Sequence, residues 1–158
     1  MFMPLTIELA QKEDCAVISN VLFEAFKEFK NQYTKRAFEH TVASPLQLES
    51  RIAEGQVWVA RLESGIVGSI GGLIISDDYH IRGMAVLPSA RGQKVGLSLL
   101  KEVESFAKKN DCTNLSLSTT PYLKSAITLY ENYGFQITND PPHDLHGTPL
   151  FTMKKKLE

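Results

Sequence analysis

The chain has no long apolar run and no recognisable export signal. No stretch approaches the roughly 20 apolar residues that a transmembrane helix needs, although 43% of the 158 residues are hydrophobic. Residues 1–5 lack both the charged segment and the long apolar segment of a secretory signal peptide. We therefore expect a cytoplasmic protein without a membrane partner. The length favours a single domain over residues 1–158.

The chain also has few cysteines and no excess of positive charge. The two cysteines, Cys15 and Cys112, have no motif spacing, which favours reduced structural thiols over a disulfide or a metal site. The formal net charge is −1, whereas proteins that bind DNA or RNA usually carry a basic excess. A solvated tail explains the basic run at residues 154–156. We therefore expect neither a nucleic-acid partner nor a bound metal.

The apolar periodicity predicts a mixed α/β fold. Helical spacing indicates helices at residues 14–30, 95–107 and 123–133, with a further helix between 31 and 50, divided into two pieces around Ser44-Pro45. β-rich segments indicate strands at residues 5–9, 56–62, 66–75, 81–87, 112–119, 135–137 and 150–155. The strand–helix–strand unit that begins at residue 81 implies a parallel pair, and the hairpins imply antiparallel neighbours.

The most informative segment extends from residue 80 to residue 100. A short apolar strand ends at Pro88 and leads through a basic, glycine-bearing turn into an amphipathic helix. Backbone N–H groups in such a turn have no intrahelical partner, so they are free to bind phosphate. Gly92 and Gly96 permit close approach, and Arg91 and Lys94 add positive charge. The alternative is an ordinary turn between a strand and a helix.

A second motif, A-I-T-L-Y-E-N-Y-G-F at residues 126–135, follows after another strand. It resembles the late helix A-x-x-L-Y-x-x-x-G-F of the GNAT superfamily of acetyl-coenzyme A-dependent N-acetyltransferases. The turn at residues 91–96 resembles the pyrophosphate turn of that superfamily, [QR]-x-x-G-x-[GA]. The two motifs lie in the superfamily's order and at a similar separation, and the resemblance spans nearly the whole chain.

The resemblance implies a central, mostly antiparallel sheet with a splayed parallel pair and flanking helices. It implies acetyl-CoA as co-substrate, with the thioester on strand N–H groups and the pyrophosphate on the turn. Two positions depart from the superfamily pattern. Lys94 stands where glycine is usual, which is tolerable if its φ is negative, and Leu123 stands where asparagine is frequent. The implied cofactor-binding residues are Met84, Ala85, Val86, Arg91, Gly92, Gln93, Lys94, Val95 and Gly96.

The same resemblance implies two catalytic residues. Tyr130 is expected to act as general acid, because a phenol of pKa near 10 stays protonated while a thiolate leaves. A core tyrosine at helical spacing is the alternative. His80, four residues before Met84, is expected to accept the amine proton through water, where many relatives have a glutamate. Asp77, Asp78 and Tyr79 compete for this role, and a histidine in a loop is the alternative.

Two further segments bear on the site. The connection over residues 139–147 contains His143 and His146, and it reads either as a loop beside the acceptor site or as a plain surface loop. Its spacing does not indicate a metal site. The run at residues 68–72 contains three glycines but no helix follows, so we expect a bulged or closely packed strand.

These features predict an N-acetyltransferase that moves an acetyl group from acetyl-CoA to a primary amine by direct attack in a ternary complex. The amine belongs to a small molecule, a peptide or a protein. The alternative is a non-catalytic acyl-CoA-binding sensor or interaction module on the same fold, for which Lys94 and Leu123 are the reasons. The identity of the acceptor is left open, and so is a homodimer.

Overall fold

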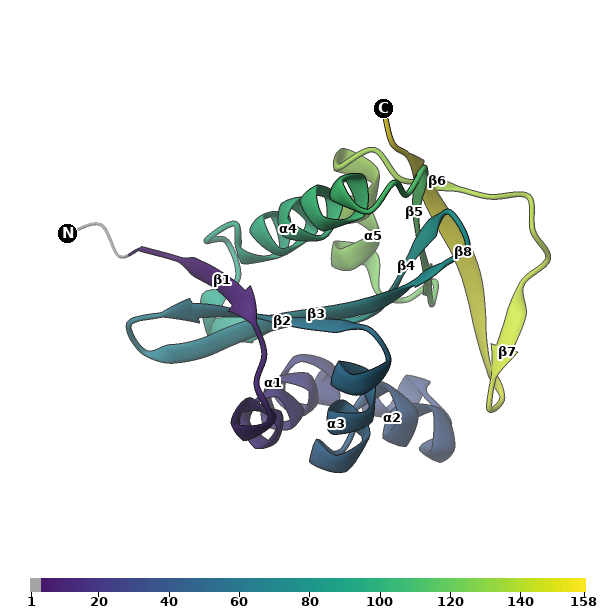
Figure 1. The fold of residues 1–158 in the computed structure, drawn as a ribbon. Coiled ribbons are helices and arrows are strands. Elements are labelled where there is room, and N and C mark those ends of the chain that lie inside the picture. Colours follow the sequence, from purple (N-terminus) through teal and green to yellow (C-terminus); the bar gives the residue numbers. More distant parts are fainter. Residues whose placement is uncertain (1–3) are drawn as a thin grey trace.

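Figure 1 shows the computed structural model, which describes residues 4–158. Residues 1–3, on which the expected absence of an export signal partly rests, lie outside the described residues. The strands are β1 (Thr6–Leu9), β2 (Gln56–Leu62), β3 (Gly65–Ile75), β4 (Asp78–Val86), β5 (Asn114–Thr119), β6 (Gln136–Ile137), β7 (His143–Leu145) and β8 (Thr148–Lys156). The α-helices are α1 (Cys15–Phe26), α2 (Lys35–Thr41), α3 (Pro45–Glu54), α4 (Val95–Lys109) and α5 (Lys124–Asn132).

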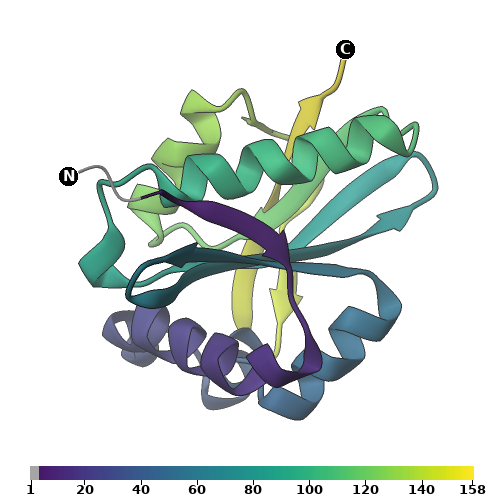
Figure 2. The ribbon, with the colours of Figure 1, turned by 60° about the vertical axis from the view of Figure 1, so that its left-hand side comes forward.

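The strands form one sheet in the order β1-β2-β3-β4-β5-β8-β6, and β7 pairs with β8. The pair β4 and β5, joined through α4, is parallel, and the neighbouring pairs are antiparallel. Helices α1, α2 and α3 cover one face, while α4 and α5 cover the other (Figure 1; Figure 2). The predicted mixed α/β fold with a parallel pair is confirmed. No helix among residues 4–158 is both long and apolar enough to cross a bilayer.

The segment between residues 31 and 50 folds as two helices, as the sequence indicated. α2 ends at Thr41, and Ser44 and Pro45 then start α3. The Ser44 hydroxyl accepts a hydrogen bond from the Gln47 N–H, and the Gln47 side chain accepts one from the Ser44 N–H. This capping box satisfies N–H groups that a helix start otherwise leaves unpaired. Pro45 stands at the first helical position, where its missing N–H costs nothing.

Helix α4 packs closely on β3 through a glycine. A Cβ on Gly68 would lie 2.9 Å from Val95 Cγ1 and 3.1 Å from the carbonyl oxygen of Ala85. Glycine is therefore required by packing here, as the closely packed strand predicted for residues 68–72 implies. The buried face of α4 consists of Val95, Leu99, Leu100, Val103 and Ala107, which recur at helical spacing.

Three boundaries differ from the sequence prediction. The first long helix ends at Phe26 and continues as a 3-10 helix over Lys27–Gln32. Strand β4 begins at Asp78, so His80 lies inside a strand and not in a loop before it. The expected loop over residues 139–147 contains β7, which forms a hairpin with β8.

Strands β4 and β5 pair only at their first residues. Their parallel ladder covers Asp78–Asn114 to His80–Ser116, and beyond it the described residues of the two strands form no further rungs. On the other side of β4, the register with β3 jumps from Ile81–Gly72 to Met84–Ile70. This jump is a β-bulge, which bends the strand that carries it. Gly83 within the bulge has a φ of +80°, which favours glycine. β4 therefore turns away from β5 just before Met84.

We expect Gly68→Ala to lower the free energy of unfolding by about 1–3 kcal/mol, because the new methyl group overpacks the contact between β3 and α4. Val95→Ala removes one of the atoms in that contact. The double variant should therefore lose less stability than the sum of the single losses, measured by urea denaturation. Strictly additive losses would contradict the close packing.

Candidate active site

Two cavities open where β4 and β5 separate. The larger cavity, about 750 Å³, is bounded by the end of α1, the residues of β4 after the bulge, the start of α4, and α5. The smaller cavity, about 390 Å³, lies between α2, α3, β4, the end of β5 and β7. The residues that line both are Phe26, Met84, Leu123 and Tyr130. The two cavities therefore meet at the bend of β4, beside Tyr130.

The basic turn borders the larger cavity. Arg91, Gly92 and Lys94 line it together with Val95 and Gly96, and Gln93 does not. Gly92 has a φ of +84°. Lys94, which caps the N-terminus of α4, has a φ of +62° and a ψ of 24°. The condition under which lysine is tolerable at this position, a negative φ, is therefore not met. The lysine holds a left-handed conformation that costs an L-residue roughly 1–2 kcal/mol.

Arg91 is engaged within the protein. Its Nη2 lies 3.0 Å from Glu28 Oε1, beyond the end of α1. Half of each side chain is exposed, at 49% and 50%, so the ion pair is weak and open to exchange with another anion. Glu28 also lines the larger cavity. An anion that binds Arg91 must therefore displace or share this carboxylate.

The bend in β4 leaves alternate backbone N–H groups without a strand partner. The Leu87 N–H donates to the Val67 carbonyl at 2.8 Å. In an antiparallel ladder every second N–H points to the same neighbouring strand. The Ala85 N–H, two residues before that of Leu87, therefore also faces β3. The N–H groups of Met84 and Val86 point the other way, where the ladder with β5 has already ended. Of the three strand residues expected to bind a thioester, Met84 and Val86 have the N–H groups that face the gap.

Tyr130 is fixed by the end of α5. The Phe135 N–H donates to the Tyr130 carbonyl at 2.9 Å and the Gly134 N–H donates to the Glu131 carbonyl at 3.0 Å. These two bonds form a Schellman motif, with Gly134 at a φ of +108°. The Phe135 ring packs against the Tyr130 ring at 5.8 Å between centroids. The Y-x-x-x-G-F pattern thus holds the tyrosine ring in one place.

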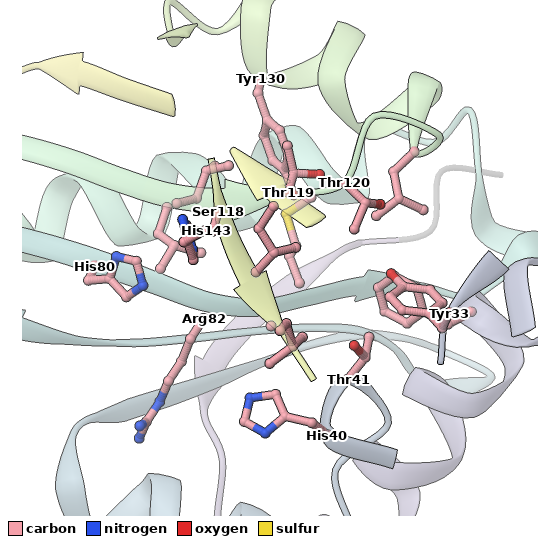
Figure 3. Close-up of a pocket in the computed structure, with 18 of the residues that line it drawn as sticks. Tyr33, His40, Thr41, His80, Arg82, Ser118, Thr119, Thr120, Tyr130 and His143 are labelled. Atoms are coloured by element: carbon pink, nitrogen blue, oxygen red, sulfur yellow. The ribbon is translucent and has the colours of Figure 1, made fainter. Parts of the chain in front are cut away.

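The Tyr130 hydroxyl is a buried group that carries a proton. The ring reaches from α5 toward Thr119 and Thr120 in the smaller cavity (Figure 3). The side chain is buried, and burial alone raises the pKa of Tyr130 to about 12. The hydroxyl is therefore protonated at every physiological pH. It can donate a hydrogen bond to an atom at the junction of the two cavities.

His80 lies where the two strands part. Its Nδ1 is 3.0 Å from Ser116 Oγ, which in turn donates a short hydrogen bond to Asp78 Oδ2. Because the serine proton points to the carboxylate, Nδ1 carries the imidazole hydrogen and Nε2 is left as the acceptor. Burial, and then Arg82 and His143, lower the pKa of His80, against the opposing effect of Asp78. The imidazole is therefore neutral at pH 7.

The β7–β8 hairpin brings the late histidines to the smaller cavity. His143 and Asp144 line it, whereas His146 lies in the turn, at a φ of +47° next to Gly147 at +92°. The Thr34 hydroxyl at the start of α2 donates to the His146 carbonyl. Of the two readings of this segment, the position beside the site fits the structure. No group of three histidine, cysteine or acidic residues within residues 4–158 is placed to hold a metal ion.

The smaller cavity also contains residues that the sequence did not single out. Arg82 follows His80 at the spacing of one strand face, and this alternation is a signal that could have found it. Arg51 and His40 come from α3 and α2, between β1 and β2, where no local pattern marks them. Asp77 and Tyr79, the competitors of His80, do not line the cavity. Asp78 acts behind His80 through Ser116.

The family that matches this chain is described as an acetyltransferase (GNAT) domain, and the match covers residues 18–157. The chain therefore belongs to the GNAT acetyltransferase family, which confirms the resemblance seen in the sequence. The chain is 35% identical over 92 residues to "Probable N-acetyltransferase family 8 member 5" of Mus musculus, which covers 54% of this chain and 40% of that protein. The chain thus spans less than half the length of this protein and of two similar N-acetyltransferases of Rattus norvegicus.

Other relatives match over more of their length. The chain is 28% identical over 127 residues to an uncharacterized N-acetyltransferase of Schizosaccharomyces pombe, which covers 77% of this chain and 76% of that protein. The PaiA N-acetyltransferase of Thermoplasma acidophilum, solved in complex with coenzyme A, superposes with a TM-score of 0.82 at 22% identity, covering 98% of this chain and all of that one. This likeness confirms the GNAT fold.

Replacement of Lys94 separates backbone strain from charge. Lys94→Gly and Lys94→Ala both remove the ammonium group, but only alanine keeps a Cβ in the left-handed conformation. We expect Lys94→Gly to be the more stable of the two by about 0.5–1 kcal/mol in urea denaturation. At Gln93, which has no positive φ, the order should be reversed. The same order at both positions would contradict the left-handed turn.

Proposed function

We propose that the protein is an N-acetyltransferase, which moves the acetyl group of acetyl-CoA directly to a primary amine held in the same complex. The observation that carries this proposal is the meeting of the two cavities at Met84 and Tyr130. Two separate binding spaces with one shared wall fit a reaction between two substrates. When the protein holds the two substrates in the reactive orientation, the attack becomes effectively intramolecular, which lowers the activation barrier of acetyl transfer.

The larger cavity is the proposed site of acetyl-CoA. N–H groups of the turn at residues 92–96 and the charges of Arg91 and Lys94 suit a pyrophosphate. The Met84 and Val86 N–H groups suit the pantetheine and the thioester carbonyl, because they face the gap between β4 and β5. The apolar walls formed by Leu123, Ala126 and Leu129 suit the pantetheine chain. Leu123 makes an apolar contact where the superfamily often has a polar one.

The proposed reaction forms one bond and breaks another. The neutral amine nitrogen attacks the thioester carbon, and the carbon–sulfur bond then breaks to release coenzyme A as a thiolate. The nitrogen loses one proton and the thiolate gains one, so the overall reaction is balanced. A backbone N–H of β4 stabilises the negative charge on the carbonyl oxygen in the transition state.

Tyr130 is the proposed general acid. With a pKa of about 12, complete transfer of its proton to a thiolate of pKa about 8.5 would be uphill by about 5 kcal/mol. Tyr130 therefore acts as general acid by partial proton transfer, through a hydrogen bond that strengthens as charge develops on sulfur, and the released thiolate takes its proton from water. A low-dielectric setting increases the strength of this bond.

His80 is the proposed base, acting through water. His80 lies on the other side of the β-bulge from Met84 and lines only the smaller cavity, so the proposed proton path to it runs through water. Both residues line the smaller cavity, so water in it can connect them. Ser116 and Asp78 hold the imidazole in the tautomer that accepts a proton.

Binding and turnover are tested together. Calorimetry should show binding of acetyl-CoA and coenzyme A but not of ATP, and thiol release should match acetylated amine across a panel of primary amines. Thermal denaturation gives a second reading, because a ligand at 100 times its Kd adds about 2.7 kcal/mol of stability. Binding of acetyl-CoA without turnover of any amine would support the sensor or interaction module instead.

Tyr130→Phe should lower kcat by about 10- to 100-fold, the cost of one hydrogen bond to a charged group, and leave the Kd of acetyl-CoA nearly unchanged. Tyr79→Phe is the matched control. Its hydroxyl donates to Gln56 Oε1 at 3.0 Å in the core, and it lines neither cavity. The control should lose stability but not kcat. An unchanged kcat in Tyr130→Phe would disprove the general-acid role.

The pH dependence of kcat tests His80. Its pKa lies below the usual 6.5, so the base is neutral at pH 7 and kcat should fall as the pH drops through that lowered pKa. His80→Gln should lower kcat and remove this acid limb. Ser116→Ala should keep the limb but lower kcat, since only the orientation of the ring is lost. If the fall of kcat at low pH persists in His80→Gln, a group other than His80 is responsible for it.

The compartment and the assembly remain proposals. The two cysteines are buried and free, which fits the proposed reducing cytoplasm. Fractionation of cells that express the untagged chain tests this location. Sedimentation of the purified protein tests the homodimer that the sequence left open.

A further inference from the structure

The smaller cavity is positively charged beyond what acetyl transfer needs. Arg51 from α3 and Arg82 from β4 both line it, and among its described lining residues Asp144 is the one carboxylate. Asp144 Oδ2 accepts a hydrogen bond from the Gly147 N–H at 2.8 Å, so this carboxylate is tied to the β7–β8 turn. Among the described lining residues no other carboxylate faces the two guanidinium groups, although Glu54, outside that lining, forms an ion pair with Arg82.

The two arginines lie close to each other and to the junction of the cavities. A Cβ on Gly83 would lie 3.2 Å from Arg51 Nη1, so the Arg51 guanidinium covers the residue between Arg82 and Met84. Burial and then the charge of Arg82 lower the pKa of Arg51, and the Glu54 carboxylate opposes this shift. Two like charges held together away from bulk water repel each other. An anion placed between them would relieve this repulsion.

Both arginines have hydrogen-bonding capacity to spare. Arg82 Nη2 lies 2.8 Å from Glu54 Oε2, yet Nη2 and Nε are buried without a well-oriented hydrogen bond to any described residue. Arg51 Nη2 donates to the His40 carbonyl at 3.4 Å, and within residues 4–158 Arg51 forms no ion pair. Planar guanidinium groups with free donors bind carboxylates and phosphates in two-point contacts.

Three of the four histidines surround the same space. His40, His80 and His143 line the smaller cavity (Figure 3). The His146 ring lies 6.0 Å from that of His40, outside the lining. The imidazoles of His40 and His143 can each donate one hydrogen bond, whereas the Nδ1 hydrogen of His80 is already engaged with Ser116. Such a lining suits an anionic group and disfavours the second ammonium group of a polyamine.

We propose that the acceptor is a small primary amine that also carries an anionic group, a carboxylate or a phosphate. The anionic group binds between Arg51 and Arg82, while the amine faces Met84 and Tyr130. Arg82 and Met84 are two residues apart and line the same cavity of about 390 Å³, so the amine and the anionic group are joined by a short chain. This proposal rests on the proposed N-acetyltransferase function.

The test compares amines that differ only in the anionic group. Glycine, β-alanine and γ-aminobutyrate are each paired with their amides, O-phosphoethanolamine is paired with ethanolamine, and putrescine represents diamines. Initial rates of thiol release give kcat/KM, calculated on the concentration of the neutral amine. We expect kcat/KM for at least one anionic acceptor to exceed that of its neutral partner by about tenfold or more, which is the effect of roughly one hydrogen bond to a charged group. The carboxylate and phosphate arms show which anion is used.

Three variants connect this preference to the arginines. Arg82→Gln should raise KM for the preferred anionic acceptor by about tenfold or more, change KM for the neutral partner much less, and leave KM for acetyl-CoA unchanged. Arg82→Lys should recover part of the loss. Glu54→Gln, which frees Arg82 from its carboxylate partner, should lower the same KM. Arg36→Gln is the control, because Arg36 is exposed on α2 and lines neither cavity. It should change neither KM for the anionic acceptor nor KM for acetyl-CoA.

The outcomes separate the two proposals. If no amine in the panel or in a wider screen is acetylated although acetyl-CoA binds, the N-acetyltransferase proposal fails. If amines are acetylated but the neutral partners or putrescine are used as well as the anionic ones, only the anionic-acceptor proposal fails. It also fails if Arg82→Gln weakens anionic and neutral acceptors equally.

Discussion

The separation of β4 from β5 after a single short stretch of pairing is the constraint on which the site depends. The ladder ends at His80 and Ser116, and the bulge at Arg82 and Gly83 turns β4 away. A sheet that continued its pairing would bury the N–H groups of Met84 and Val86 in hydrogen bonds. Because the pairing stops, both cavities open at this point and share a wall.

Other features of the fold preserve this opening. β5 stays paired with β8 as far as Thr119, so the strand does not collapse toward β4. The Schellman motif at the end of α5 sets Tyr130 over the junction. The β7–β8 hairpin is tied to the start of α2 through Thr34, and it closes the far side of the smaller cavity. Each contact joins elements distant in sequence, which keeps the gap from closing.

The part of the site on the larger cavity was predictable, because short local patterns encode it. Glycine at positions 92, 96 and 134 marks a turn, a helix start and a helix end, each with a physical reason for glycine. The exception is Lys94, which takes a left-handed conformation that the residue type disfavours. The predictions for individual residues at this site remain to be tested by substitution.

The smaller cavity was not predictable in the same way. Arg51, Arg82 and His40 come from three different elements, and only the fold brings their side chains together. The sequence does not mark the β7–β8 hairpin, because its turn is His146-Gly147, with two positive φ values, where asparagine or aspartate before glycine is the usual signal. The residues of an acceptor site are therefore visible only in three dimensions.

The central claim, that the unpaired N–H groups of β4 bind acetyl-CoA, is tested most directly by amide hydrogen exchange. With saturating acetyl-CoA, exchange at Met84 and Val86 and at residues 92–96 should slow. Exchange at Ala85, whose N–H already faces β3, should change little. Slowing confined to other segments, or equal slowing at Ala85 and its two neighbours, would contradict the account.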